Sequence, residues 1–243
     1  MKQLGLLGVL CLLLALLQGC VSSGKRSEDP EKAAQIYADL GLEYLRQGNL
    51  DLAVSKLERS LELDSKLPRA NHYIAEAYKQ QGEMKLAEEY YNKAVDYDSD
   101  NPMLLNNYGA FLCGQGRIEE SEEYFTRAAE VPSYRTPELA YENQALCALQ
   151  NGNKTKAEEY FRKALNVKPV LPKALYQMAL LTYEQQEFLK ARAFIERFHA
   201  LGRTEKSLKL AIKIEWALGD KAAVARLRET MRIEFPNADP DRD

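Results

Sequence analysis

The stretch LGLEYLRQGNLDLAVSKLERSLELD, residues 40–64, has the pattern of two short amphipathic helices joined by a turn at Gly48. On each side of that glycine, apolar residues recur every three or four positions, the spacing of one face of an α-helix. Three later stretches repeat the pattern: IAEAYKQQGEMKLAEEYYNKAVDYD (74–98), YGAFLCGQGRIEESEEYFTRAAEVP (108–132) and QALCALQNGNKTKAEEYFRKALNVKP (144–169). The sequence therefore predicts a series of helical hairpins.

The turns recur with a period of about 34 residues. They lie at Gly48, Gly82, Gly116, Gly152, Gln186 and Gly219, with successive spacings of 34, 34, 36, 34 and 33 residues. A fixed period of this length is typical of stacked helical repeats. The unit resembles the tetratricopeptide repeat, whose first-helix signature is matched by Leu40-Gly41 and Tyr44. Ala157 and Phe161 match the signature of the second helix.

The resemblance implies an all-α fold, a right-handed superhelix of about six helix-turn-helix repeats over residues 32–236, with a disordered tail at 237–243. We expect small residues where the two helices of a repeat cross, because larger side chains would separate the helices and leave voids. These are Gly41, Ala75, Gly109, Ala145 and Ala179 on first helices, and Ala53, Ala87, Ser121, Ala157 and Ala191 on second helices. Repeat six has Ile212 near that position, so five repeats plus a capping helix pair is the alternative count.

The N-terminal residues have the pattern of an export signal. The apolar run from Leu4 to Leu17 follows Lys2 and is shorter than the roughly 20 residues of a membrane-spanning helix. It ends in LLALLQGC, residues 13–20, whose last four residues resemble the lipobox of bacterial lipoproteins. The resemblance implies that residues 1–19 are removed and that Cys20 is lipidated. The alternative is a signal cut at another site, with Cys20 incidental.

Lipidation of Cys20 would fix where the protein is attached. Two or three acyl chains form a stable membrane anchor, whereas one chain holds only marginally. Residues 20–31 lack apolar periodicity, so we expect a flexible tether after the lipidated cysteine. Position 21 is valine rather than the aspartate that favours retention at the inner membrane. We therefore expect attachment to the outer membrane, facing the periplasm.

Composition and motifs argue against several functions. The 33 basic and 36 acidic residues nearly balance, whereas nucleic-acid binders carry a basic excess. No phosphate-binding loop, HExxH or GxSxG motif is present. The histidines, His72 and His199, have no metal-ligand spacing, and we expect both on helix surfaces. The pairs Glu88-Glu89, Glu122-Glu123 and Glu158-Glu159 are expected on a solvated outer face. We predict a non-enzymatic protein without a metal, cofactor or small-molecule substrate.

Two cysteines, Cys113 and Cys147, remain in the predicted repeat region. They lie on the first helices of repeats three and four, which should pack side by side. Because the periplasm is oxidising, we favour a disulfide between them. The alternative is two buried free thiols, since cysteine also packs as a small apolar residue.

The first helices of such an array line its concave face, where a protein segment could bind. We expect this groove to be lined by Leu42, Leu45, His72, Glu76, Lys79, Asn106, Asn107, Asn143, Leu146, Leu149, Tyr176, Leu180 and Tyr183. Asparagine amides can hold a peptide backbone by donating and accepting hydrogen bonds at once. These residues contain no Lys/Arg cluster, which disfavours capture of a C-terminal carboxylate. For each residue the alternative role is packing between repeats.

Four stretches are similar to the PilF/PilW family of type IV pilus biogenesis lipoproteins. They are LLNNYGAFLC (104–113), ENQALCAL (142–149), PELAYENQALCALQNGN (137–153) and ALYQMALLTYEQQEFLKARAFIERF (174–198). The resemblance implies a pilotin, which binds the pilus secretin and promotes its outer-membrane localisation and multimer assembly. Cys20 would then be the lipid site, and Cys113 and Cys147 the cysteine pair of the family. The alternative function is a lipoprotein scaffold for periplasmic cell-wall enzymes.

Overall fold

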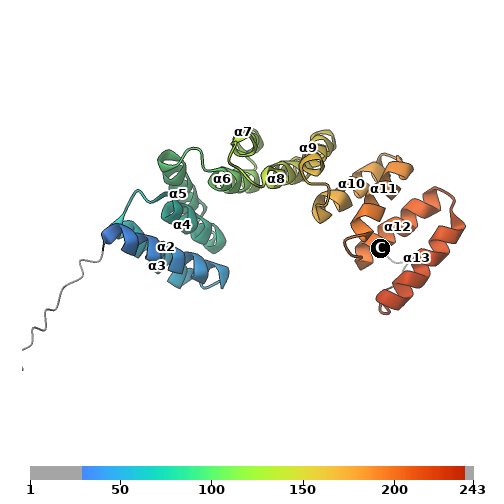
Figure 1. Ribbon diagram of the computed structural model, residues 1–243, viewed down its shortest axis with the longest axis horizontal. Coiled ribbons are helices and arrows are strands. Elements are labelled where there is room, and N and C mark those ends of the chain that lie inside the picture. Colours follow the sequence, from blue (N-terminus) through green and yellow to red (C-terminus); the bar gives the residue numbers. More distant parts are fainter. Residues whose placement is uncertain (1–28, 239–243) are drawn as a thin grey trace, which may run out of the picture.

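A computed structural model describes residues 29–238, which form twelve helices and no strand (Figure 1). Repeat one pairs α2 (Pro30–Arg46) with α3 (Leu50–Leu63), repeat two α4 (Pro68–Gln81) with α5 (Met84–Tyr97), and repeat three α6 (Pro102–Gly114) with α7 (Ile118–Glu130). Repeat four pairs α8 (Pro137–Gln150) with α9 (Lys154–Val167), repeat five α10 (Pro172–Glu184) with α11 (Phe188–His199), and repeat six α12 (Glu205–Ala217) with α13 (Lys221–Glu234). The predicted all-α array of six helical hairpins is confirmed.

Only some of the predicted domain boundaries fall within residues 29–238. The signal segment 1–19, Cys20 and residues 239–243 of the predicted tail lie outside them. Helix α2 begins at Pro30, with Asp29 as its N-cap, so helix replaces the last two residues of the predicted tether. Within residues 29–238, no helix has both the length and the apolar character that a membrane span requires.

Local sequence explains where the helices begin and turn. Proline opens five of the six first helices, where its missing N–H costs nothing because the first helical N–H groups have no intrahelical acceptor. The turn glycines take a left-handed backbone, as at Gly48 (φ 73°) and Gly82 (φ 85°). Asn49 and Asn153 then cap the second helices through their side-chain oxygens.

The crossing of the two helices in a repeat requires small residues, as the sequence predicted. A Cβ placed on Gly41 would lie 2.4 Å from Leu57 Cγ, and one on Gly109 would lie 3.0 Å from the ring of Phe125. The alanines at the equivalent positions of repeats two, four and five are fully buried. Close contact between the helices of each pair is therefore built into the repeat.

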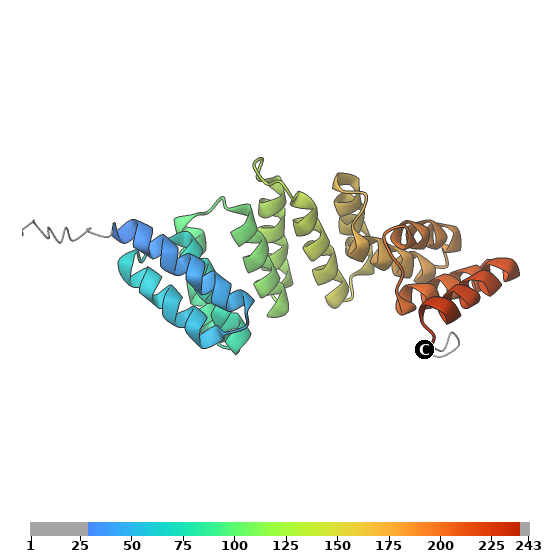
Figure 2. The same cartoon turned by 60° about the horizontal axis from the view of Figure 1, so that its bottom comes forward.

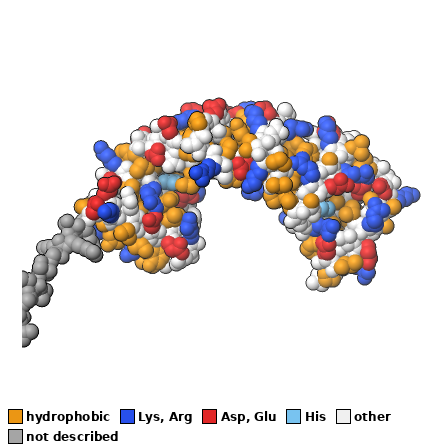
Figure 3. Space-filling view, viewed as in Figure 1, with side chains coloured by type: hydrophobic (Ala, Val, Ile, Leu, Met, Phe, Trp, Pro, Cys, Tyr) orange, Lys and Arg blue, Asp and Glu red, His pale blue; other side chains and the backbone are white. Residues whose placement is uncertain are grey.

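The six hairpins stack into an arch (Figures 1 and 2). Each second helix packs against the first helix of the next repeat, and the apolar core runs along the array as a series of clusters. First helices also contact one another, as α2 does α4, α6 does α8 and α10 does α12. The space-filling view shows the arch hollowed on one side (Figure 3).

Gln186 occupies a turn position where the other repeats have glycine. Its φ is 63°, the only positive value among described residues other than glycine, and this backbone costs about 1–2 kcal/mol for a residue with a Cβ. We expect Gln186→Gly to raise the free energy of unfolding by about 0.5–1 kcal/mol, because the higher backbone entropy of glycine offsets part of the gain. Urea unfolding would measure the change.

The matched control is Gln115→Gly. Gln115 is also an exposed glutamine at the end of a first helix, but its φ is −87°, so glycine relieves no strain there. This substitution should leave stability unchanged or lower it. Equal shifts in the two variants would show that the turn at Gln186 is not strained.

Candidate functional site

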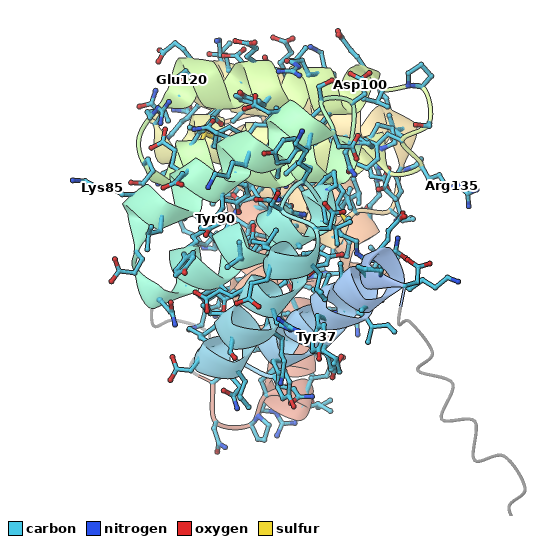
Figure 4. The ribbon with its side chains drawn as sticks, turned by 90° about the vertical axis from the view of Figure 1, so that its left-hand side faces the viewer. Tyr37, Lys85, Tyr90, Asp100, Glu120 and Arg135 are labelled. Carbon is cyan, nitrogen blue, oxygen red and sulfur yellow. A yellow bond between two sulfur atoms is a disulfide. The ribbon has the colours of Figure 1, made fainter. Side chains whose placement is uncertain are left out.

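The first helices form the inner side of the arch. They are the helices that contact each other between repeats, and neighbours on the inner side of a curved stack lie closest together. The end-on view agrees, since Glu120 of the second helix α7 lies at the opposite, outer edge (Figure 4). A partner gripped by the array would therefore meet α2, α4, α6, α8, α10 and α12.

The predicted groove residues divide into two groups. Ten are partly exposed: Leu42, Glu76, Lys79, Asn107, Asn143, Leu146, Leu149, Tyr176, Leu180 and Tyr183. Three are no more than 9% exposed, namely Leu45, His72 and Asn106. These three were placed wrongly as lining residues, because contacts with neighbouring helices cover them. They support the concave face from beneath.

Hydrogen bonds between polar side chains link three consecutive first helices. Asn107 Nδ2 on α6 donates to His72 Nε2 on α4 over 3.0 Å. Asn143 Nδ2 on α8 donates to Asn106 Oδ1 on α6 over 3.1 Å. Within α6, Asn106 Nδ2 lies 3.5 Å from Asn107 Oδ1. We call these four residues the asparagine ladder. It holds the exposed amides of Asn107 and Asn143 in fixed positions on the concave face.

His72 is buried, not on a helix surface as the sequence analysis expected. Burial lowers the pKa of its imidazole to about 4, although Glu76 one turn away acts in the opposite direction. A neutral ring matches the ladder, because Nε2 must accept a hydrogen bond from Asn107 Nδ2. Glu76 itself accepts from the Tyr91 hydroxyl and from Lys79, so its charge is also partnered. His199 is half-buried and contacts the Ser207 hydroxyl at 3.0 Å.

Apolar side chains continue the concave face beyond the ladder. Leu146 and Leu149 on α8 pack partly against the core of repeat four. Tyr176 and Tyr183 on α10 pack partly against the core between repeats five and six, where Tyr176 lies 5.8 Å from Phe198 between ring centroids. Each side chain thus has one edge packed in the array, and its exposed edge is compatible with the groove role, which stays a prediction.

Cys113 on α6 and Cys147 on α8 are joined in a disulfide, the pairing that the sequence analysis favoured over free thiols. Their Cα atoms are 5.9 Å apart, and both residues are buried with Phe125. The bond ties the first helices of repeats three and four directly beside the asparagine ladder.

Only one glutamate of each pair is exposed, although both were expected on a solvated face. The second member of each pair is exposed, whereas Glu88, Glu122 and Glu158 accept hydrogen bonds from the next repeat. Glu122 on α7, for example, accepts from Lys156 Nζ at 2.7 Å and Tyr160 Oη at 2.5 Å, both on α9. These contacts are structural, and residues 29–238 contain no group of three His, Cys, Asp or Glu side chains that could hold a metal.

Sequence reasoning missed the concave face of α12. Counting from α10 at the repeat spacing of 33 residues, Trp216 falls at the position of Tyr183. Its side chain is 75% exposed, the most among large apolar residues of the described chain. The signal was available in Gly219, which sets the register of repeat six, but the groove prediction stopped at repeat five.

Comparisons with known proteins agree with this architecture. The family model described as YpiA-like, C-terminal tetratricopeptide repeats matches residues 68–132, and models described as tetratricopeptide repeat match residues 34–67 and 112–172. Type IV pilus assembly protein PilF of Pseudomonas aeruginosa is 34% identical over 236 residues, which cover 94% of each chain.

Two solved structures have the same fold along most of their length. One, from a functional characterisation of Pseudomonas aeruginosa PilF, has a TM-score of 0.75 at 33% identity and covers 86% of this chain and 95% of its own. The other is PilW, described as a widely conserved type IV pilus biogenesis factor, with a TM-score of 0.71 at 28% identity, covering 85% and 96%.

Proposed function

Because the chain belongs to the PilF/PilW family of type IV pilus biogenesis proteins, we propose that it is a lipid-anchored pilotin. In this proposal it binds secretin subunits of the pilus through its concave face and promotes their localisation and multimer assembly at the outer membrane. The observation that carries the proposal is the match to a pilus assembly protein over nearly the whole of both chains. A match to only part of the chain would support the tetratricopeptide-repeat fold but not the function.

The concave face suits binding rather than catalysis. Asn107 and Asn143 present amides that donate and accept, and Leu146 and Tyr183 add apolar edges toward the C-terminal end of this polar row. An extended segment needs such a combination, because its backbone must form hydrogen bonds while its side chains find apolar contacts. No step of the proposed role requires a reacting group.

The anchor and the groove would act together. Acyl chains on Cys20 would confine the protein to the outer membrane, and the groove would select the partner. Confinement raises the effective concentration of a bound secretin subunit where its multimer must form. The acidic and basic residues of the chain nearly balance, which leaves recognition to local contacts rather than to the overall charge.

Cys20→Ala tests the anchoring role. We expect the variant to fold and to bind secretin in the periplasm, but outer-membrane secretin multimers should fall to a small fraction of the wild-type amount. Membrane fractionation followed by gel analysis of the heat-resistant multimer would measure this. Normal multimers at the outer membrane in that strain would contradict the proposal.

A pair of asparagine variants tests the groove. Asn143→Ala removes one amide from the concave face together with its bond to Asn106. The matched control is Asn92→Ala on the second helix α5, which loses the bond from the Tyr108 hydroxyl of α6. We expect weaker capture of secretin from detergent-solubilised envelopes with Asn143→Ala only. Capture of murein synthases or hydrolases in place of secretin would favour the cell-wall scaffold.

A further inference from the structure

One side of α12, exposed at Lys206, Lys213 and Trp216 and partly covered at Lys209, combines a basic row with the single tryptophan of the chain. Lys206, Lys209, Lys213 and Trp216 are spaced by three, four and three residues, which places them on one side of the helix. We call these four residues the lysine–tryptophan face. Its members Lys209, Lys213 and Trp216 are the counterparts, 33 residues on, of Tyr176, Leu180 and Tyr183 in α10. It therefore continues the concave face to the last repeat.

The apolar core contacts of α12 come from the opposite side of the helix, where Leu208, Ala211 and Ile214 are buried. Lys209 forms an ion pair with Glu205 at 2.9 Å along the same helix. An exposed tryptophan side chain that is not used in packing is typical of an anchor at a protein interface, where it is buried by the partner.

The C-terminal repeat also differs from the rest of the chain in charge. Residues 203–234 contain eight Lys or Arg and five Asp or Glu, a net charge of +3, whereas residues 235–243 add three Asp and one Arg and the whole chain carries −3. A positive helix pair on an otherwise acidic protein attracts an acidic partner and orients it during encounter.

We propose that the lysine–tryptophan face binds an acidic protein segment that carries one aromatic or large aliphatic residue against Trp216. The proposal rests on the proposed function, and the segment would belong to the secretin. From Lys206 to Trp216 the helix rises about 15 Å, the length of roughly five extended residues. The motif sought is therefore short: several Asp or Glu within about five residues of an apolar anchor.

Lysine and tryptophan also suit an anionic bilayer surface. The position of α12 favours a protein segment, because it contacts α10 on the inner row of first helices. An inner, concave surface accommodates an extended chain, whereas a flat bilayer meets outer surfaces first (Figure 3). Binding to lipid is thus an outcome that would overturn the proposal.

The single tryptophan provides the measurement. Overlapping tryptophan-free peptides from the periplasmic part of the secretin would be titrated against the full lipoprotein in vesicles of zwitterionic lipid, so that Trp216 is the only tryptophan in the sample. We expect acidic peptides with an aromatic or aliphatic residue to shift the emission to shorter wavelength. Versions with Lys in place of Asp and Glu should have no effect, and added salt should weaken binding.

Charge reversal tests which face is used. Lys206→Glu combined with Lys213→Glu should weaken peptide binding at least tenfold. The matched control, Lys163→Glu combined with Lys190→Glu, makes the same change in net charge on the second helices α9 and α11. Equal affinities in the two double variants would overturn the proposal. So would a peptide series without an emission shift, or a shift with phosphatidylglycerol vesicles alone.

Secretin assembly in cells separates this inference from the proposed function. If the Lys206 and Lys213 double variant builds normal multimers and Cys20→Ala does not, the lysine–tryptophan face is wrong and the pilotin role stands. If the lipoprotein captures no secretin and Cys20→Ala leaves multimers normal, the proposed function itself fails.

Discussion

Removal of the Cys113–Cys147 disulfide is expected to lower the free energy of unfolding by about 3–4 kcal/mol. The bond closes a loop with a sequence separation of 34 residues, and its loss returns that conformational freedom to the unfolded chain. Cys113→Ala combined with Cys147→Ala should show the loss in urea unfolding. Full-length chains carrying Cys20→Ala would be compared, since this background removes the acyl chains and leaves residues 29–238 unchanged.

Because the disulfide joins two repeats, we expect its removal to weaken the whole array and not only the structure around the two cysteines. Repeat arrays are stabilised mainly by contacts between nearest neighbours, so one weakened junction can uncouple the two sides. The disulfide ties α6 to α8 at the junction of repeats three and four, in the middle of the arch (Figure 1). We expect the double variant to unfold over a broader range of urea, with repeats one to three separating from repeats four to six.

Reduction by dithiothreitol provides an independent control. It should reproduce the loss in the parent chain and have no effect on the double alanine variant, whose buried methyl groups keep most of the local packing. Ser121, whose hydroxyl lies 3.6 Å from Cys147 Sγ, would lose only a weak contact. Identical unfolding midpoints with and without reductant would contradict the stabilising role.

The repeat fold could be predicted because its signals are local. Helical periodicity and the turn glycines recur within each hairpin, and Gly41 and Gly109 occur where the structure allows no Cβ without movement of Leu57 or Phe125. Gln186 shows the limit of this reasoning. The array holds it in the conformation of the missing glycine, because the neighbouring repeats fix the direction of the chain.

The concave face was harder to predict because it depends on contacts between repeats. His72 is polar and its helix is amphipathic, so the sequence favours an exposed position, whereas Asn107 and Tyr91 pack beside it in the structure. The contribution of α12 was missed for another reason. Gly219 gave the register of repeat six, but Ile212 stands where a small residue was expected and made this repeat atypical, so the groove prediction ended at repeat five and left out Trp216.

The buried histidine leads to the second large prediction. His72 has a pKa of about 4 in the folded protein and an ordinary value of 6.5, so between these values the unfolded chain binds a proton that the folded chain does not. The free energy of unfolding is therefore unaffected by the titration of His72 above pH 6.5, and it falls as the pH drops from 6.5 toward 4. We expect a loss of about 3 kcal/mol across this window, since each pH unit of pKa difference corresponds to about 1.4 kcal/mol.

The groups around His72 do not offset this loss of stability at low pH. Glu76 favours the charged ring, but it is already bonded to Tyr91 and Lys79, and Lys79 opposes protonation. On the neighbouring helix α6, Asn107 offers an N–H that a protonated ring cannot accept. Protonation would thus break the bond between α4 and α6 at the start of the asparagine ladder.

His72→Gln isolates this contribution. Carboxylates also titrate between pH 4 and 6.5, but they are the same in both proteins, so their effect cancels in the difference between the two stability curves. The difference should shift by about 3 kcal/mol between pH 7 and pH 4, with wild type losing more. His199→Gln is the comparator: burial also lowers the pKa of His199, but this ring is only half-buried and its effect should be smaller. Parallel curves for wild type and His72→Gln would mean that His72 is accessible to protons in the folded array.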